Sequence, residues 1–305
     1  MNLTPRGRAN LILLLTSVIW GFAFVAQRAG MDHVGPFTFN GVRFLIGGLA
    51  LLPLIAVLDR GRRGRGEAVV PLGSRPLLVG GTLAGAFLFG GAALQQMGIQ
   101  STTAGKAGFI TGLYVVLVPI LGLFIGQRTS AGTWIGAGLA AIGLYFLTMQ
   151  GDLTIQRGDL LVLMGAFIWA GHVQLLGRLS PGTDPIKLAA VQFFACAALS
   201  LAAAFAVESV VWADIAAGWA PILYTGLMSV GVGYTLQVVG QRHARPADAA
   251  IILSLEAVFA VIGGWLFLNE QLGLRGLVGC GMMLAGILVS QLFGQPRPVH
   301  DPAAA

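Results

Sequence analysis

Residues 9–28 read ANLILLLTSVIWGFAFVAQR, and residues 158–178 read GDLLVLMGAFIWAGHVQLLGR. Each block is an apolar run of about 20 residues, the length that a helix needs to cross a hydrocarbon core about 30 Å thick. Each also carries a tryptophan near its middle, Trp20 in the first block and Trp169 in the second. The two blocks therefore predict transmembrane helices, and the shared tryptophan suggests that the second repeats the first.

The composition extends this prediction to the whole chain. Of the 305 residues, 56% are hydrophobic and only 10% are charged, with a mean hydropathy of +0.83. Soluble domains carry about 25% charged residues, so a water-soluble fold is excluded. We expect an all-α membrane protein of ten transmembrane helices. The predicted spans are residues 9–28, 38–58, 76–97, 106–126, 131–149, 158–178, 187–207, 216–240, 247–268 and 272–293.

The distribution of basic residues predicts the orientation of these spans. With ten spans, 13 of the 18 Lys and Arg residues fall on the side of the termini, four fall on the other side, and Arg43 lies within a span. Because cytoplasmic loops carry the excess of positive charge, both termini should be cytoplasmic. The charges are scattered over short loops, apart from a cluster between Arg60 and Arg65, so we expect no nucleic-acid partner. The two cysteines, Cys196 and Cys280, lie within apolar spans and predict neither a disulfide framework nor a metal site.

An internal repeat relates the two halves of the chain. Trp20 and Trp169 are 149 residues apart, and Ala107 and Ala249 are 142 apart, with neighbouring residues matching at each offset. Each repeat contains five spans, which is an odd number, so the second repeat should enter the membrane in the opposite orientation. The predicted repeats are residues 1–149 and residues 150–305.

Inverted repeats are common in secondary transporters, whose two halves rock about a site near the bilayer midplane to give alternating access. Some passive channels are also inverted repeats, and saturable flux with counterflow of labelled solute would separate a carrier from a channel. An ATP-binding loop is not predicted, because the residues around Gly105-Lys106 do not match the phosphate-binding motif. We therefore expect transport driven by gradients, with no ATPase partner and no cofactor.

An intramembrane enzyme is the alternative from another functional class. Ser229 and His243 offer a nucleophile and a base on one helix, but fourteen residues separate them, which is about 21 Å along the helix axis. Pairing Ser229 with His172 would require the two helices that carry them to approach each other. We expect the protein not to be an enzyme.

Polar and ionisable side chains at membrane depth are costly and mark binding sites or pathways. Trp20 lies on one helical face with Thr16, Ser17 and Gln27, near mid-bilayer, and Trp169 occupies the same depth in the second repeat. Tyrosine and glutamine side chains elsewhere could bind rings and amide groups together, or could anchor span ends. The candidate substrate-binding residues are Trp20, Asn40, Arg43, Gln95, Tyr114, Trp169, His172, Tyr234 and Gln237.

Three ionisable residues within spans have alternative interpretations. His172 could donate a hydrogen bond to a solute, or it could be a packing residue whose hydrogen bonds are satisfied. Arg43 could bind a substrate carboxylate, or its side chain could snorkel toward the interface, about six residues away. Glu256 lies about 15 Å from either interface, where it could couple transport to protons or form a structural hydrogen bond to an adjacent helix terminus.

Several passages resemble the drug/metabolite transporter superfamily, in particular its EamA-type branch. Residues 18–24 (VIWGFAF) resemble the Trp-Gly motif of the family's first helix, and Pro36 followed by Arg43-Phe44 resembles its second helix. Residues 249–272 resemble the family's most recognisable segment, although Ala257 and Asn269 replace its usual Pro and Gly. The similarity covers nearly the whole chain.

This resemblance implies ten helices around a central cavity, and export or exchange of small organic solutes across a bacterial inner membrane. It does not imply one substrate. The aromatic and amide side chains favour aromatic or neutral amino acids, with cationic drugs or other metabolites as the alternative. Phosphorylated solutes are disfavoured, because Lys106 and Lys187 map near span ends.

Overall fold

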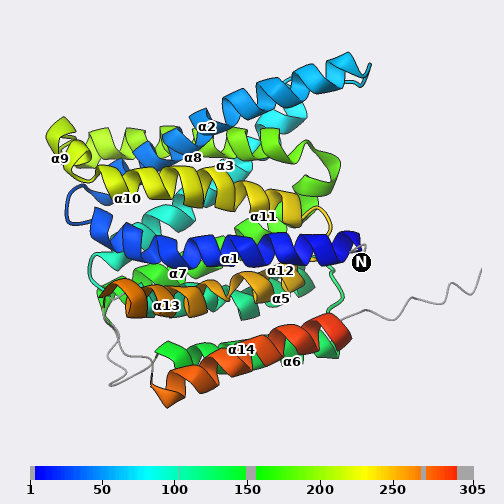
Figure 1. The fold of residues 1–305 in the computed structure, drawn as a ribbon, viewed down its shortest axis with the longest axis vertical. Helices are drawn as coiled ribbons and strands as arrows, with labels where there is room; N and C mark the ends of the chain where they lie inside the picture. Colours follow the sequence, from blue (N-terminus) through cyan, green and yellow to red (C-terminus); the bar gives the residue numbers. More distant parts are fainter. Residues whose placement is uncertain (1–3, 103, 149–155, 269–272, 294–305) are drawn as a thin grey trace, which may run out of the picture.

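A computed structural model of the chain describes residues 4–102, 104–148, 156–268 and 273–293. Within these ranges every regular element is a helix, and the long helices lie side by side in a bundle (Figure 1). A bundle suits a hydrocarbon environment, because each helix satisfies its own backbone hydrogen bonds without water. The prediction of an all-α fold is confirmed.

The helices follow the apolar blocks closely. The first part of the chain forms α1 (Pro5–Gly30), α2 (Pro36–Gly64), α3 (Arg75–Ile99), α4 (Ala104–Gly112), α5 (Tyr114–Phe124) and α6 (Ala131–Thr148). The second part forms α7 (Arg157–Leu179), the 3₁₀ turn η1 (Ser180–Gly182), α8 (Pro185–Val207), α9 (Trp212–Ala217), α10 (Trp219–Tyr224), the π-helix η2 (Thr225–Tyr234), α11 (Thr235–Gly240), α12 (Pro246–Leu253), α13 (Glu256–Leu268) and α14 (Leu274–Phe293).

Among the described residues, eight helical stretches are long and apolar enough to cross a membrane. Two further helices, Ala131–Phe146 and Leu274–Ser290, are apolar but shorter. The protein is therefore a multi-pass membrane protein, and the count of ten spans stays a prediction. The predicted junction between the repeats, at residues 149 and 150, lies outside the described residues.

Local sequence sets where several helices begin. Proline occupies the first turn of α1, α2, α3, α8 and α12, where its missing N–H group costs no intrahelical hydrogen bond. The Asp184 side chain caps α8 by accepting from the backbone N–H groups of Ile186 and Lys187. Glu208, which follows α8, accepts from two backbone N–H groups at the start of α2. A carboxylate thus satisfies the first turn of both helices.

The structure corrects two expectations about the second and eighth spans. Most of the arginine cluster expected in a loop belongs to α2, which continues to Gly64 and so carries Arg60, Arg62 and Arg63 on its last turns. The eighth span is not one regular helix. It consists of α10, a π-helix of ten residues and α11.

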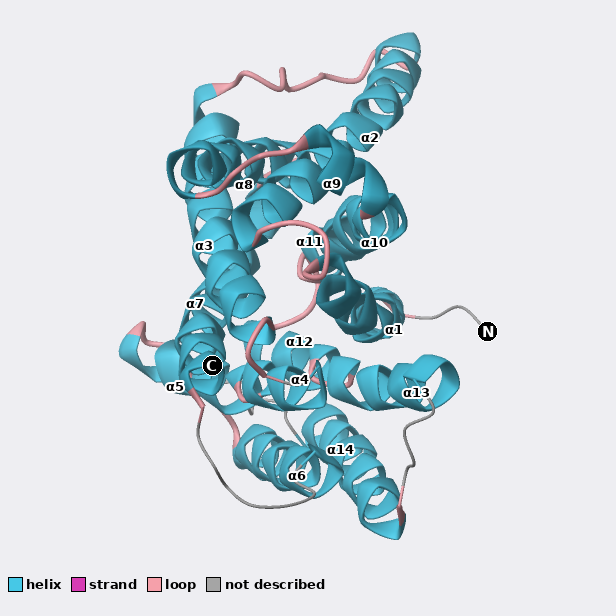
Figure 2. Ribbon diagram, turned by 90° about the vertical axis from the view of Figure 1, so that its left-hand side faces the viewer, coloured by secondary structure: helices cyan, strands magenta, loops and turns pink. Residues whose placement is uncertain are grey.

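Contacts between the two parts of the chain hold the bundle together. Helix α2 packs on α8, α6 packs on α14, and α3 packs on both α7 and α8. Helix α1 packs on α13 and on the segment from α10 to α11. Figure 2 shows α6 and α14 as a pair beside the remaining helices. All of these helix pairs join residues before position 149 to residues after position 156.

Glycine allows α6 and α14 to approach each other closely. A Cβ atom on Gly136 would lie 2.6 Å from the carbonyl oxygen of Gly286, and a Cβ atom on Gly286 would lie 2.6 Å from the carbonyl oxygen of Gly136. These distances are shorter than van der Waals contact, so the two backbones touch only because side chains are absent. Small residues commonly permit such contacts between membrane helices.

We predict that Gly286→Val destabilises the protein by about 1–3 kcal/mol or more, because the added side chain must push α14 away from α6. The measurement is the apparent melting temperature of the purified protein in detergent. Gly138→Val on the same pair of helices is the matched control, since nothing lies within 4 Å of a Cβ atom at Gly138. Equal melting temperatures for the two variants would contradict the close approach.

Candidate substrate-binding cavity

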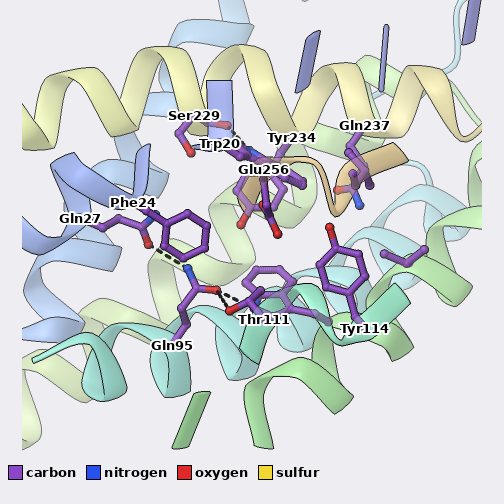
Figure 3. A pocket seen from close by; sticks show the side chains of 13 residues that line it. Trp20, Phe24, Gln27, Gln95, Thr111, Tyr114, Ser229, Tyr234, Gln237 and Glu256 are labelled. Carbon is purple, nitrogen blue, oxygen red and sulfur yellow. Dashed lines mark hydrogen bonds between the residues drawn. The ribbon is translucent and has the colours of Figure 1, made fainter. Parts of the chain in front are cut away.

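A narrow cavity of about 30 Å³, room for about one water molecule, lies between helices from both parts of the chain. Figure 3 shows Trp20, Tyr234 and Gln237 on one side of the cavity and Gln95, Thr111 and Tyr114 on the other, so that each side carries both aromatic and polar side chains. The lining residues are Trp20, Phe24, Gln27, Gln95, Thr111, Tyr114, Trp169, Val173, Ser229, Tyr234, Gln237, Leu253 and Glu256. Seven of the ten residues named from the sequence as site or coupling candidates are therefore brought together here.

Three aromatic rings pack together in the cavity. The Tyr234 ring centroid lies 4.5 Å from that of Trp20 and 6.0 Å from that of Trp169, which is stacked on Tyr234 with an interplanar angle of 22°. The two tryptophans that the repeat relates thus both pack against one tyrosine. Because the rings pack against each other, a solute of any size can enter only if they move apart.

A network of hydrogen bonds links polar side chains of the cavity. Gln95 Oε1 accepts from Trp169 Nε1 at 3.0 Å and from Thr111 Oγ1 at 3.5 Å, while Gln95 Nε2 donates to Gln27 Oε1 at 3.1 Å. Separately, Trp20 Nε1 donates to the backbone oxygen of Ser229 at 3.2 Å. These bonds fix both indole rings and orient the Gln95 amide toward the cavity.

Three buried oxygen atoms that line the cavity make no close hydrogen bond with the described residues. They are Tyr114 Oη, Gln237 Oε1 and Glu256 Oε1. A buried polar group without a partner costs about 1–3 kcal/mol. Such groups in one cavity are suited to bind polar atoms of a ligand or water.

Irregular backbone positions several of these residues. Ser229 and Tyr234 belong to the π-helix η2, an element that often occurs at functional sites. Tyr114 is the first residue of α5, directly after the break from α4, and Glu256 is the first residue of α13, after the break from α12. The sequence pattern predicted continuous helices at all three places.

Three candidates from the sequence do not line the cavity. His172 is fully buried, and its Nε2 atom hydrogen-bonds to Gln192 Oε1 at 3.0 Å. Its ring lies edge-on to Trp169, so it packs against that tryptophan and does not line the cavity. Asn40 and Arg43 form a separate buried pair, in which Arg43 Nε donates to Asn40 Oδ1 at 2.9 Å.

Arg43 does not snorkel toward the interface, as one interpretation of the sequence expected. Its side chain is 2% exposed, and its guanidinium carbon lies 5.4 Å from the ring centroid of Phe39 and 4.9 Å from that of Phe44. Attraction between the cation and the two aromatic faces, with the Asn40 hydrogen bond, offsets the cost of removing the charge from water. Lys187 is buried as well, and its ammonium group pairs with Asp59 at 2.7 Å.

Sequence reasoning missed part of the lining. Phe24 lies four residues after Trp20, and Thr111 lies three residues before Tyr114, so helical spacing could have placed both on the faces of known candidates. Val173 and Leu253 are ordinary apolar residues, and no sequence signal distinguishes them from the many others in the core. Ser229 was noted only in connection with an enzyme.

The EamA-like transporter family matches residues 7–149 and, a second time, residues 156–292. The chain belongs to this family. The resemblance to the drug/metabolite transporter superfamily is thereby confirmed.

Relatives in archaea and in bacteria are named as transporters. An uncharacterized transporter from Archaeoglobus fulgidus is 32% identical over 93% of this chain and 86% of its own length. The uncharacterized inner membrane transporter YedA of Escherichia coli is 24% identical over 90% of this chain and 88% of its own. A solved crystal structure superimposes with a TM-score of 0.76 over 94% of this chain and 97% of the other, and at 20% identity it shows the fold alone. The protein is a transporter, and these names give no substrate.

We predict that Gln95→Leu destabilises the protein, because it leaves the Trp169 indole N–H and the Gln27 amide oxygen without partners. Trp169→Phe removes the donor of the same hydrogen bond, which is the indole N–H group. The two variants should therefore not be additive, and the double variant should lose less in melting temperature than the sum of the single losses. Additive losses would contradict a shared hydrogen bond.

Proposed function

We propose that this EamA-like transporter is a secondary transporter that carries small amphipathic solutes across a bacterial inner membrane by alternating access. The cavity that contains Trp20, Trp169 and Glu256 is its substrate site. The proposal rests mainly on one observation. Three aromatic rings, several amide side chains and one carboxyl group line a single cavity between the two parts of the chain. The membrane assignment takes support from the name of the relative YedA.

The proposal includes two inverted five-helix repeats, residues 1–149 and 150–305, ten spans and cytoplasmic termini. The double match to one family supports two repeats. The packing of the helices supports a twofold relation, because α2 packs on its counterpart α8 and α6 on its counterpart α14. The contact of α3 with α7 likewise has its counterpart in the contact of α1 with the segment from α10 to α11. Two such halves can rock about a cavity between them.

The substrates that fit this chemistry best carry an apolar or aromatic body and an ammonium group. A ring can stack among Trp20, Trp169 and Tyr234, where aromatic pairs gain about 0.5–1.5 kcal/mol beyond the area they bury. An ammonium group can pair with Glu256 and hydrogen-bond to the free oxygen of Gln237. Aromatic and neutral amino acids satisfy both requirements, and their carboxylate can accept from the Tyr114 hydroxyl.

Organic cations without a carboxylate are the second candidate class. Within the described lining, Glu256 is the single carboxylate, and the lining includes no Lys, Arg or His residue. A substrate carboxylate would therefore meet only neutral donors there. This charge balance favours amines over amino acids, whereas the number of amide groups favours amino acids.

Matched substrate pairs separate the two classes. We predict saturable uptake and counterflow in liposomes that contain the purified protein, for either phenylalanine or phenethylamine, and likewise for tryptophan or tryptamine. The members of each pair differ only in the carboxylate, so the preferred member identifies the class. No flux above empty liposomes for any of the four would overturn the substrate proposal, and flux that does not saturate would indicate a channel.

We predict that Trp20→Ala and Trp169→Ala each lower the transport efficiency kcat/KM for the preferred solute about 10-fold or more. Loss of one ring contact of about 1.4 kcal/mol corresponds to a factor of ten. Trp212→Ala is the matched control, because Trp212 is 80% exposed and lies outside the cavity. An equal effect of all three substitutions would contradict a role for the two cavity tryptophans in binding.

A further inference from the structure

Two helices are broken at matching places. Helix α4 ends at Gly112 and α5 begins at Tyr114, while α12 ends at Leu253 and α13 begins at Glu256. The repeat offset of 142 residues that relates Ala107 to Ala249 also relates Tyr114 to Glu256.

The two residues that begin the second half of each broken helix face each other in the cavity. Tyr114 and Glu256 are both 4% exposed, and both line the same cavity (Figure 3). The phenol and the carboxyl group interact through charge and through a loose hydrogen bond with each other, and neither Tyr114 Oη nor Glu256 Oε1 makes a close hydrogen bond with any described residue. The corresponding positions of the two repeats thus place a phenol, which can donate a hydrogen bond, opposite a carboxyl group in the cavity.

The surroundings of Glu256 offer no fixed positive charge among the side chains that are described. Tyr114 on α5 and Tyr234 on η2 are the titratable groups that face it. Helix α1, which packs on α13, has no charged residue between Arg8 and Arg28, and Asp248 on α12 is bonded to Arg6 and Arg245 instead. Arg43 lies behind Tyr234, against Phe39 and Phe44. The side chain of Lys106, on α4, lies outside the described residues.

A carboxylate buried in this cavity needs a cation as its partner, whereas a protonated carboxyl group does not. An isolated buried charge is far more costly than a neutral group, so the empty cavity favours the protonated form or a hydrated one. An ammonium group in the cavity requires the opposite, because only the carboxylate can neutralise it. Proton and ammonium therefore compete for one group.

We propose that Glu256 exchanges one proton for the ammonium group of the solute, which makes this carrier a proton antiporter. The inference rests on the proposed function. When the solute binds, the Glu256 carboxyl group releases its proton to water and the carboxylate pairs with the ammonium group. When the solute leaves on the other side, the carboxylate takes up one proton there. Tyr114 is a positioning residue, whose hydroxyl donates to the carboxylate while neither cation is present.

Proton release on binding tests the exchange directly. Phenethylammonium chloride or phenylalanine, whichever gives flux in liposomes, is added to the purified protein in weakly buffered detergent solution with a pH indicator dye. Both amino groups are already protonated at neutral pH, so a released proton comes from the protein. We expect about one proton per bound solute in the wild type at some pH between about 5.5 and 8.5, and a tenfold weaker affinity per pH unit below the titration of Glu256.

Variants separate the exchange from a loss of folding. Glu256→Gln should release no proton and should lose accumulation driven by a pH gradient, whereas Glu256→Asp should restore both in part. Asp32→Asn, which removes an exposed carboxylate, should behave as the wild type does. Tyr114→Phe should keep proton release and change the pH at which affinity is half-maximal.

The outcomes distinguish this inference from the proposed function. If no solute is bound or carried, the proposed function fails. If flux saturates, but binding releases no proton and its affinity is constant from about pH 5.5 to 8.5, the exchange is overturned and the carrier stands. Proton release that persists in Glu256→Gln would overturn the assignment to this residue.

Discussion

A hydrocarbon core offers no hydrogen-bond partners, and this constraint governs where every polar group of the protein lies. Backbone groups are satisfied within helices. Buried polar side chains find partners inside the bundle: Lys187 pairs with Asp59, Arg43 with Asn40, and Gln95 with both Gln27 and Trp169. The cavity gathers Tyr114, Gln237 and Glu256, each with an oxygen atom that makes no close hydrogen bond with the described residues, so one ligand can satisfy three buried groups at once.

The helix pair α2 and α8 is tied at both of its ends by charged groups. At one end, Arg62 pairs with Asp184, and Lys187 pairs with Asp59. Burial raises the pKa of the Asp184 carboxyl, but the Arg62 guanidinium and two backbone N–H groups outweigh it and hold the pKa below its ordinary value. At the other end, Glu208 caps α2. The broken helices, by contrast, surround the cavity, so the irregular backbone lies where the solute would bind.

The two repeats share backbone positions more than they share side-chain types. The tryptophans Trp20 and Trp169 correspond in both sequence position and place, and they pack on the same tyrosine. Tyr114 and Glu256 correspond in position, yet one is a phenol and the other an acid. Because only one of the two corresponding positions carries a carboxyl group, the cavity can bind a single positive charge. Two carboxylates at these positions would repel each other.

The sequence by itself determined the helical membrane fold, because about 20 apolar residues per span leave no other structure that satisfies the backbone in lipid. It also predicted most of the polar and aromatic lining of the candidate cavity, since costly polar residues at mid-span and the repeat both pointed to Trp20, Trp169 and Glu256. Only the tertiary structure decided which candidates meet. His172 and Arg43 carry the same sequence signal as Glu256, but His172 bonds to Gln192 and Arg43 lies between two phenylalanine rings. The breaks before Tyr114 and Glu256 were equally invisible, because Gly112 precedes the first but glycines also lie inside unbroken helices, and no proline or glycine lies within five residues of Glu256.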